Sequence, residues 1–251
     1  MLTGLVSVTF RQLSPDEIVS LVTKAGLDGI EWGADIHCPP GQIEKAKEIA
    51  SLMADNRLKT ISYGSYYRVG TFDSFDEILE SAAILGTKNI RVWAGSIGSK
   101  IATEDDWQKA VEDSKRIADL ALNQNIDISF EYHGDTLTDT IETTERLLSE
   151  IDRDNIFSYW QPPVGLSFED NISSIKRLTK LNKLKNFHIF SWENEPNGVI
   201  RQPLETKGED WIHYIKEASN HVEALLLEFV KDDDPAQFLI DAEYLFKIKG
   251  K

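Results

Sequence analysis

The sequence predicts a (β/α)₈ TIM barrel that forms a single domain over residues 1–251. Short apolar runs rich in β-branched and aromatic residues alternate eight times with amphipathic helical patterns. No Pro-, Gly- or Ser-rich linker divides the chain, and 251 residues is an ordinary size for one such barrel. A doubly wound open sheet is the alternative. The chain contains neither GxGxxG nor GxxxxGK[ST], the glycine-rich phosphate motifs that would favour it.

The predicted strands are short, and polar or glycine-containing segments separate them from the helical patterns. Such runs are typical of strands that are buried inside an α/β fold. In chain order they are Leu5–Phe10, Asp28–Trp32, Thr60–Tyr63, Asn89–Trp93, Asp127–His133, Phe157–Gln161, Asn186–Trp192 and Ala224–Val230.

The starts of the helices carry capping signatures. The segment Ser14–Glu17 is a capping box with proline at the first helical position. Acidic residues in a first helical turn also suit the positive end of the helix dipole, so we interpret them as caps rather than catalysts. Similar segments predict helices after the fourth, fifth, sixth and eighth strands: Thr103–Asp106, Thr136–Asp139, Ser167–Asp170 and Asp234–Gln237.

Composition narrows the class of partner. The chain has 27 basic and 42 acidic residues, a formal net charge of −15, so it should repel nucleic acids and anionic membranes. Cys38 is the only cysteine, which rules out an internal disulfide and fits a reducing cytoplasm. The N-terminus lacks a basic leader, and no apolar run reaches the ~20 residues of a membrane span. We therefore expect a cytoplasmic protein that acts on a small molecule, and we leave open whether it forms homo-oligomers.

The active site of such a barrel lies at the carboxyl ends of its strands. In the fifth predicted strand, polar residues that include Glu131 and His133 alternate with apolar ones, and Arg91 shares this parity in the fourth strand. The polar side chains should therefore face the barrel axis. An inward charge is costly unless it is paired or coordinates an ion, which favours a polar, metal-centred site.

These residues also have structural interpretations. Glu131 could form an ion pair with Arg91, and His188 could be a hydrogen-bonded core histidine. Glu228 is surrounded by apolar residues, which disfavours a solvated position. Tryptophans at strand ends are either core aromatics or, as a cluster, a surface for the apolar faces of a sugar: Trp32, Trp93, Trp160 and Trp192.

The phrase Ala-Gly-Leu-Asp-Gly-Ile-Glu-Trp at 25–32 resembles the opening of xylose isomerase-like TIM barrels. That superfamily contains sugar isomerases, ketose 3-epimerases, inosose dehydratases, hydroxypyruvate isomerases and apurinic-site endonucleases. The resemblance covers essentially the whole chain and is strongest to compact bacterial proteins described as sugar phosphate isomerases/epimerases. The order Glu, polar, His, Glu on strands five to eight is its more specific part.

The resemblance implies a divalent metal ion (Mn, Mg, Zn or Co) held by one residue from each of these four strands. Carried over by position, the ligands are Glu131, Gln161, His188 and Glu228. Gln161 stands where the family has Asp. A glutamine oxygen can bind a hard cation but adds no charge, so the affinity should be lower and the occupancy of the site is an open question.

The resemblance further implies a sugar, sugar phosphate or keto-polyol isomerase or epimerase. Glu131 and Glu228 would be the catalytic acid and base, transferring protons next to a carbonyl through an enediolate. Residues that would orient the sugar-like substrate are His37, Arg68, Arg91, His133 and Arg201.

Three alternatives use the same barrel. A dehydratase or lyase acting on a cyclic polyol or keto-acid shares the residues and differs in the leaving group. A non-catalytic sugar-binding barrel with a detuned metal site is favoured by Gln161. Phosphodiester hydrolysis of damaged DNA is disfavoured by the net charge of −15.

Overall fold

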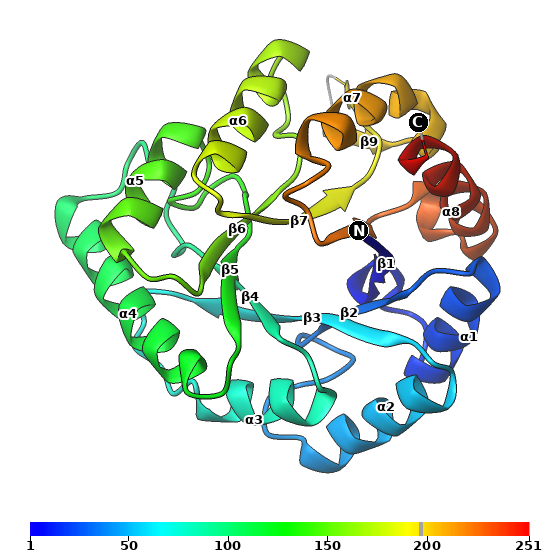
Figure 1. Cartoon of the computed structure of the whole chain (residues 1–251), viewed down its shortest axis with the longest axis horizontal. Coiled ribbons are helices and arrows are strands. Elements are labelled where there is room, and N and C mark those ends of the chain that lie inside the picture. The colour runs from blue at the N-terminus through cyan, green and yellow to red at the C-terminus, as the bar shows by residue number, and fades with distance from the viewer. Residues whose placement is uncertain (196–197, 251) are drawn as a thin grey trace.

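The computed structural model describes residues 1–195 and 198–250 and confirms the predicted barrel. Its eight parallel strands close in the order β1-β10-β7-β6-β5-β4-β3-β2, with the helices outside them (Figure 1). Closure excludes the open-sheet alternative. The barrel strands are β1 (Leu2–Val6), β2 (Gly29–Gly33), β3 (Lys59–Arg68), β4 (Asn89–Trp93), β5 (Asp127–Phe130), β6 (Ile156–Trp160), β7 (Leu184–Ile189) and β10 (Ala224–Leu227).

Eight α-helices are described around the barrel, and each buries one apolar face against the strands. None of the helices within residues 1–195 and 198–250 is both long and apolar enough to cross a bilayer. The helices are α1 (Pro15–Ala25), α2 (Ile43–Asp55), α3 (Asp76–Leu85), α4 (Glu104–Leu122), α5 (Ile141–Ile151), α6 (Phe168–Lys180), α7 (Gly208–Ala218) and α8 (Pro235–Lys249).

Four of the five predicted helix caps are confirmed. The side chains of Ser14, Thr103, Ser167 and Asp234 each accept a hydrogen bond from the first turn of a helix. The prediction for Thr136–Asp139 is wrong.

Helix α5 begins later than predicted, because Thr140 forms the capping box with Thr143. Thr136 lies in the preceding loop, where its hydroxyl donates to the carbonyl oxygen of His133. Thr136 and Thr140 are four residues apart, and only Thr140 directly precedes a helix, which begins at Ile141.

The first strand was also misplaced. The predicted segment Leu5–Phe10 is only partly β1, and residues Ser7–Phe10 form a 3₁₀ turn, η1. All four residues of that turn are buried, and polar Ser7 and Thr9 alternate with apolar Val8 and Phe10, so the pattern does not distinguish the turn from a strand. The fifth, sixth, seventh and eighth strands likewise end before the last residues predicted for them.

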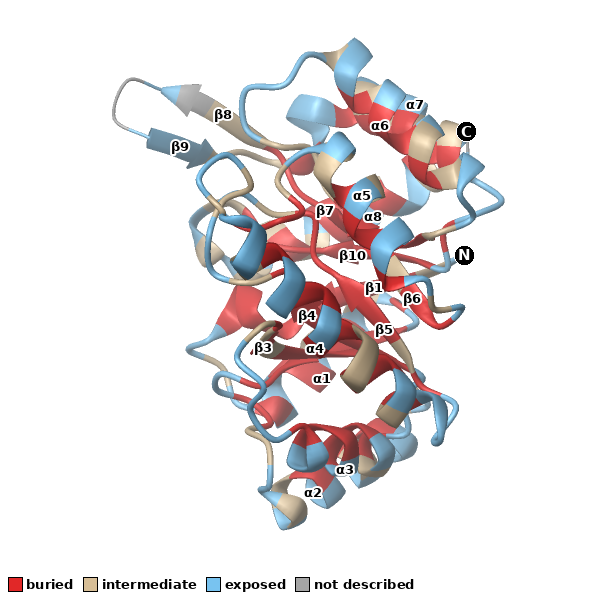
Figure 2. Ribbon diagram, turned by 90° about the vertical axis from the view of Figure 1, so that its left-hand side faces the viewer, coloured by how far each residue is buried: buried red, intermediate tan, exposed pale blue. Residues whose placement is uncertain are grey.

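A hairpin that was not predicted follows β7. Strand β8 (Trp192–Glu195) pairs antiparallel with β9 (Gly198–Arg201), and Figure 2 shows the pair projecting from the barrel. Trp192 was assigned to the end of the seventh strand, whereas it begins this hairpin.

Hydrogen-bonded polar side chains occupy part of the barrel interior. Asn89 donates to the hydroxyls of Ser62 and Tyr159 at 2.9 and 3.0 Å, and accepts a hydrogen bond from Ser129 at 2.6 Å. Asn186 also donates to the Tyr159 hydroxyl, at 2.8 Å. The predicted inward direction of the polar residues in the fourth and fifth strands is thereby confirmed for Asn89 and Ser129.

Candidate active site

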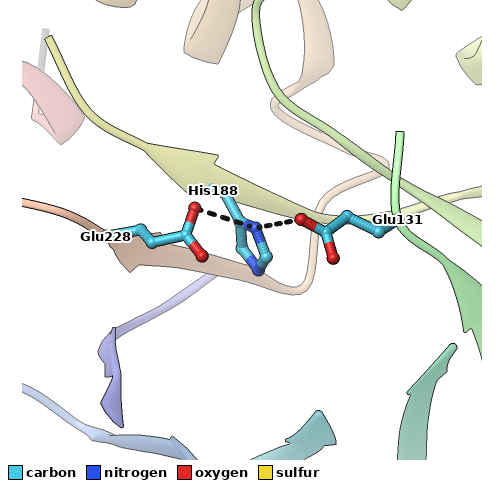
Figure 3. A group of neighbouring side chains, drawn as sticks. All are labelled: Glu131, His188 and Glu228. Carbon is cyan, nitrogen blue, oxygen red and sulfur yellow. Dashed lines mark ion pairs between the residues drawn. The ribbon is translucent and has the colours of Figure 1, made fainter. Parts of the chain in front are cut away.

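Four residues from consecutive barrel units converge at the carboxyl ends of the strands. His188, in β7, lies between Glu131, which follows β5, and Glu228, which follows β10 (Figure 3). Its Nδ1 atom is 3.4 Å from Glu228 Oε2, 3.9 Å from Glu131 Oε1 and 3.2 Å from Gln161 Oε1. The structure therefore brings together the four residues that the sequence suggested as metal ligands.

The electrostatics of this cluster favour a positive charge at its centre. Burial alone would lower the pKa of His188, but Glu228 and Glu31 raise it to about 10. Burial would raise the pKa of Glu228, but His188 and Arg91 hold it below its usual value. Without a metal ion, the imidazolium supplies the cation that the carboxylates require.

The donor set also fits a hard divalent cation. Within residues 1–195 and 198–250, Glu131, His188 and Glu228 form a group whose ligand atoms lie within 4.8 Å of one another. His188 Nε2 is buried, has no hydrogen-bond partner among these described residues, and lies 3.7 Å from Glu31 Oε1. A proton on Nε2, facing Glu31, would leave the Nδ1 lone pair free to bind an ion.

Glu31 is a residue of the site that sequence reasoning missed. It is fully buried in β2 and accepts hydrogen bonds from Arg91 Nε at 2.7 Å and from the Tyr159 hydroxyl at 2.8 Å. Burial would raise the pKa of Glu31, but Arg91 and His188 lower it to about 2. Its signal in the sequence is its place in the phrase at 25–32 that carries the resemblance to the family.

Arg91 lies beneath the site, where it positions Glu31 and Glu131, and does not line the cavity surface. It is 1% exposed and also forms an ion pair with Glu131 through Nη1. The ion pair between Arg91 and Glu131 that the sequence suggested is present, and Glu31 and Glu131 hold the guanidinium inside the protein rather than at the surface where contact with substrate was expected.

A cavity of about 340 Å³ opens over the cluster and is called the catalytic cavity here. Glu131, Gln161 and Glu228 line it together with His133 and Trp192. His133 Nδ1 lies 2.7 Å from the carbonyl oxygen of Gly134. A carbonyl oxygen can only accept, so Nδ1 must carry the proton, and Nε2 of the neutral ring has a free lone pair.

Two further predicted residues accompany His133. Its ring stacks on Trp93, with centroids 4.6 Å apart, and the Arg68 guanidinium lies 3.9 Å from the Trp93 ring centroid. Arg68 also donates to the carbonyl oxygen of Gly95 at 3.1 Å. All three residues are partly exposed, whereas the indole Nε1 of Trp93 is buried, so the ring of Trp93 and not its N–H group is available to a ligand.

Trp32 and Trp160 do not lie in the catalytic cavity. Both are fully buried in the hydrophobic core, and Trp160 donates its indole N–H to Ser174 on α6. Both rings therefore lie in the core rather than at the expected substrate position, because Trp32 has the opposite parity to Glu31 along β2, and Trp160 packs among the aromatic side chains of α7.

His37 and Arg201 have partners of their own. His37 is 2% exposed and hydrogen-bonds to Ser7 Oγ and the Leu13 carbonyl oxygen, at 3.0 and 3.2 Å. These contacts fit a structural role rather than the predicted contact with substrate. Arg201, in β9, forms an ion pair with Asp233 and lies over the ring of Phe229, which lines the catalytic cavity.

Comparison with known proteins places this geometry in a family. The sequence profile of the xylose isomerase-like TIM barrels matches residues 19–245. The chain belongs to this family. A relative is the 3-dehydroshikimate dehydratase of Bacillus anthracis, which is 28% identical over 219 residues, covering 78% of this chain and 76% of the relative.

Solved structures share the fold. The probable 3-DHS dehydratase AsbF of Bacillus anthracis has a TM-score of 0.81 and 21% identity, covering 98% of this chain and 99% of that one. An L-ribulose 3-epimerase has a TM-score of 0.75 and 14% identity, covering 99% and 94%. A xylose isomerase-like TIM barrel protein from Mycobacterium smegmatis in complex with magnesium has a TM-score of 0.71 and 12% identity, covering 99% and 96%.

Proposed function

We propose that this protein is a metal-assisted dehydratase that acts on a small cyclic β-hydroxy ketone or keto-acid of the 3-dehydroshikimate class. The observation that carries the proposal is the cluster of Glu131, His188 and Glu228 in a cavity whose wall also contains His133. The 28% identical relative, a 3-dehydroshikimate dehydratase, favours dehydration over other reactions of this fold.

Glu131, Gln161, His188 and Glu228 would hold the divalent ion. Such an ion, when bound, stabilises the negative charge that develops on a carbonyl oxygen as a neighbouring C–H bond breaks. The protein supplies four donors for it from four strands, with Arg91 and Glu31 fixing Glu131 and His188 from beneath.

His133 is the proposed base. Its Nε2 lone pair accepts the proton from the carbon next to the carbonyl, and the electron pair of that C–H bond forms a new C=C bond. The hydroxyl on the next carbon leaves with its bonding electrons and takes up the proton that His133 Nε2 has accepted, which forms water and returns the imidazole to its neutral form. Gly134 keeps the proton on Nδ1, so the ring presents the correct nitrogen.

Arg68, Trp93 and Trp192 are the proposed substrate contacts. Arg68 and Trp93 stack beside His133, where a guanidinium can bind a carboxylate or hydroxyl oxygens of the substrate. Trp192 lines the catalytic cavity with Phe190, and their apolar surface suits the hydrocarbon face of a ring. Arg201 does not line the cavity itself, but its guanidinium packs on the ring of Phe229, which does.

Epimerisation by Glu131 and Glu228 is the second candidate. The position of these two carboxylates on either side of His188 favours it, because an epimerase needs proton-transfer groups on both faces of its substrate (Figure 3). Arg91 occupies one oxygen of Glu131, however, and leaves less of that carboxylate for proton transfer. A 3-epimerase of L-ribulose has the same fold.

The two reactions give different products. With Mn²⁺ or Mg²⁺ present, 3-dehydroshikimate should lose water to give an aromatic product, which is measured by its ultraviolet absorbance. His133→Gln should lower kcat by about 10²–10⁴-fold, and His221→Gln, an exposed histidine remote from the cavity, should leave it unchanged. Epimerisation of D-fructose or L-ribulose without dehydration would replace the dehydratase proposal with the second candidate. Turnover of neither substrate class would favour a binding role.

A further inference from the structure

A second, larger cavity lies outside the barrel. It has a volume of about 640 Å³ and is enclosed by α6, α7, β8 and the loop at 162–166, and we call it the side cavity. It adjoins the catalytic cavity, because Phe190, Trp192 and residues 162–164 line both. The proposed dehydration uses none of the residues that line only the side cavity.

Aromatic side chains form the inner part of the side cavity. The rings of Trp211 and Tyr214 stand at 86° with centroids 5.6 Å apart, and Phe190 and Trp192 stack at 4.2 Å. Hydrogen bonds hold these rings in place: the Trp211 indole donates to the Phe190 carbonyl oxygen at 2.8 Å, and Asn171 donates to the Tyr214 hydroxyl at 3.2 Å. A fixed aromatic surface of this kind attracts cations to the faces of its rings.

The charged residues of the side cavity are mostly acidic. Glu193, Glu195 and Asp210 line it, against Lys207 as the one basic lining residue among the described residues, so the balance is 1 − 3 = −2. Within residues 1–195 and 198–250, none of the three carboxylates forms an ion pair. A ligand that fills this space is therefore expected to be positively charged.

Asn171 independently indicates that the ligand of the side cavity carries hydrogen-bond donors. Its side chain is 4% exposed and lines the side cavity, and its Oδ1 atom has no hydrogen-bond partner among the described residues. A buried acceptor without a donor is costly, and a small shift of the Asn171 side chain that brings Oδ1 into the side cavity would let a ligand with N–H groups relieve it. A primary ammonium group has three donors and one charge, which matches both Asn171 and the carboxylates.

We propose that the side cavity binds a small organic ammonium ion, a protonated primary amine attached to an apolar body. The aromatic rings contact the body and the positive charge, and the carboxylates with Asn171 Oδ1 accept the N–H hydrogen bonds. This site is distinct from the metal cluster, and it does not depend on the reaction that the catalytic cavity performs.

The test is a binding measurement on the whole chain with Mg²⁺ present. Isothermal titration calorimetry compares phenethylammonium with 2-phenylethanol, which is similar in size and has no charge. We expect the ammonium ion to bind about tenfold more tightly or better. The double variant Glu195→Gln/Asp210→Asn should weaken ammonium binding by about tenfold and leave the alcohol unaffected. The matched control is Glu205→Gln/Glu209→Gln, two exposed acids of the same region that do not line the side cavity.

Several results would overturn the proposal. They are equal binding of the amine and the alcohol, no binding of the amine, and equal losses in the two double variants. A loss of amine binding in Glu228→Gln, with none in Glu195→Gln/Asp210→Asn, would place the amine in the catalytic cavity instead. Circular dichroism of each variant separates a loss of binding from a loss of fold.

Discussion

A single carboxylate, Glu31, links the barrel interior to the candidate active site. It accepts hydrogen bonds from Arg91 and Tyr159, and its Oε1 atom faces His188 Nε2 at 3.7 Å. Arg91 in turn pairs with Glu131. The positions of two of the candidate metal ligands therefore depend on a residue that lies one layer below them and has no access to solvent.

The guanidinium of Arg91 is only 1% exposed, and the carboxylates of Glu31 and Glu131 balance its charge. Glu31→Gln removes one of these two negative charges. We expect the free energy of unfolding to fall by about 3–5 kcal/mol, because a buried charge is left with incomplete compensation. Urea unfolding measures the change. Glu44→Gln, which removes the partner of Lys47 in an exposed ion pair, should cost at most about 1 kcal/mol. Similar losses in the two variants would show that Glu31 does not have this role.

The sequence predicted the candidate metal ligands better than it predicted the buried residues that hold those ligands in place. Glu131, His188 and Glu228 could be found because each stands at a strand end, where the barrel fold brings residues from distant segments together. Glu31 and Tyr159 also lie on strands, but their importance comes from contacts between strands that a one-dimensional pattern does not contain. The same limit applies to Trp32 and Trp160, whose parity along their strands decides between a core position and a site position.

At the scale of elements, the strand ends are shaped by close packing inside the barrel. Gly64 in β3 pairs with Arg91 in β4. A Cβ atom at Gly64 would lie 2.7 Å from Arg91 Nη2 and 3.1 Å from Glu31 Oε1. The absence of a side chain at this position leaves the space in which the buried ion pair sits.

Gly64→Ala should therefore disturb the ion pair. The new methyl group must displace the guanidinium, which we expect to lower the free energy of unfolding by about 1–3 kcal/mol. Gly134→Ala is the control, since a Cβ atom there would have no neighbour within 4 Å among the described residues. Thermal or urea unfolding of both variants measures the difference. Equal stability of Gly64→Ala and the unmodified chain would contradict this description of the packing.

Elements were predicted well in number and order, but less well in their limits. The helix caps fixed four helix starts, since Ser, Thr and Asp side chains satisfy free N–H groups at a defined position. Strand ends lacked such markers. The turn Ser7–Phe10 alternates polar and apolar residues, and Trp192 is a large aromatic residue, so both resemble a continued strand in the sequence.

At the scale of the whole molecule, the barrel concentrates polar chemistry on its axis. The interior network around Asn89 and Tyr159 leads upward to Glu31 and Arg91, and then to the cluster at the carboxyl ends of the strands. The apolar core lies mainly between the strands and the helices. Because the apolar core lies in the outer layer, the fold can tolerate charged side chains on the barrel axis. The carboxylates of Glu31, Glu131 and Glu228 gather there around His188.

The metal content of the purified protein tests the central claim most directly. Elemental analysis of protein prepared without chelators, in buffer containing Mn²⁺ or Mg²⁺, should find about one divalent ion per chain. His188→Ala should lose that ion, because it removes the nitrogen on which Glu131, Gln161 and Glu228 converge, and His221→Ala should retain it. An unmodified protein without the ion, or a His188→Ala variant that keeps it, would contradict the assignment of this cluster as the metal centre.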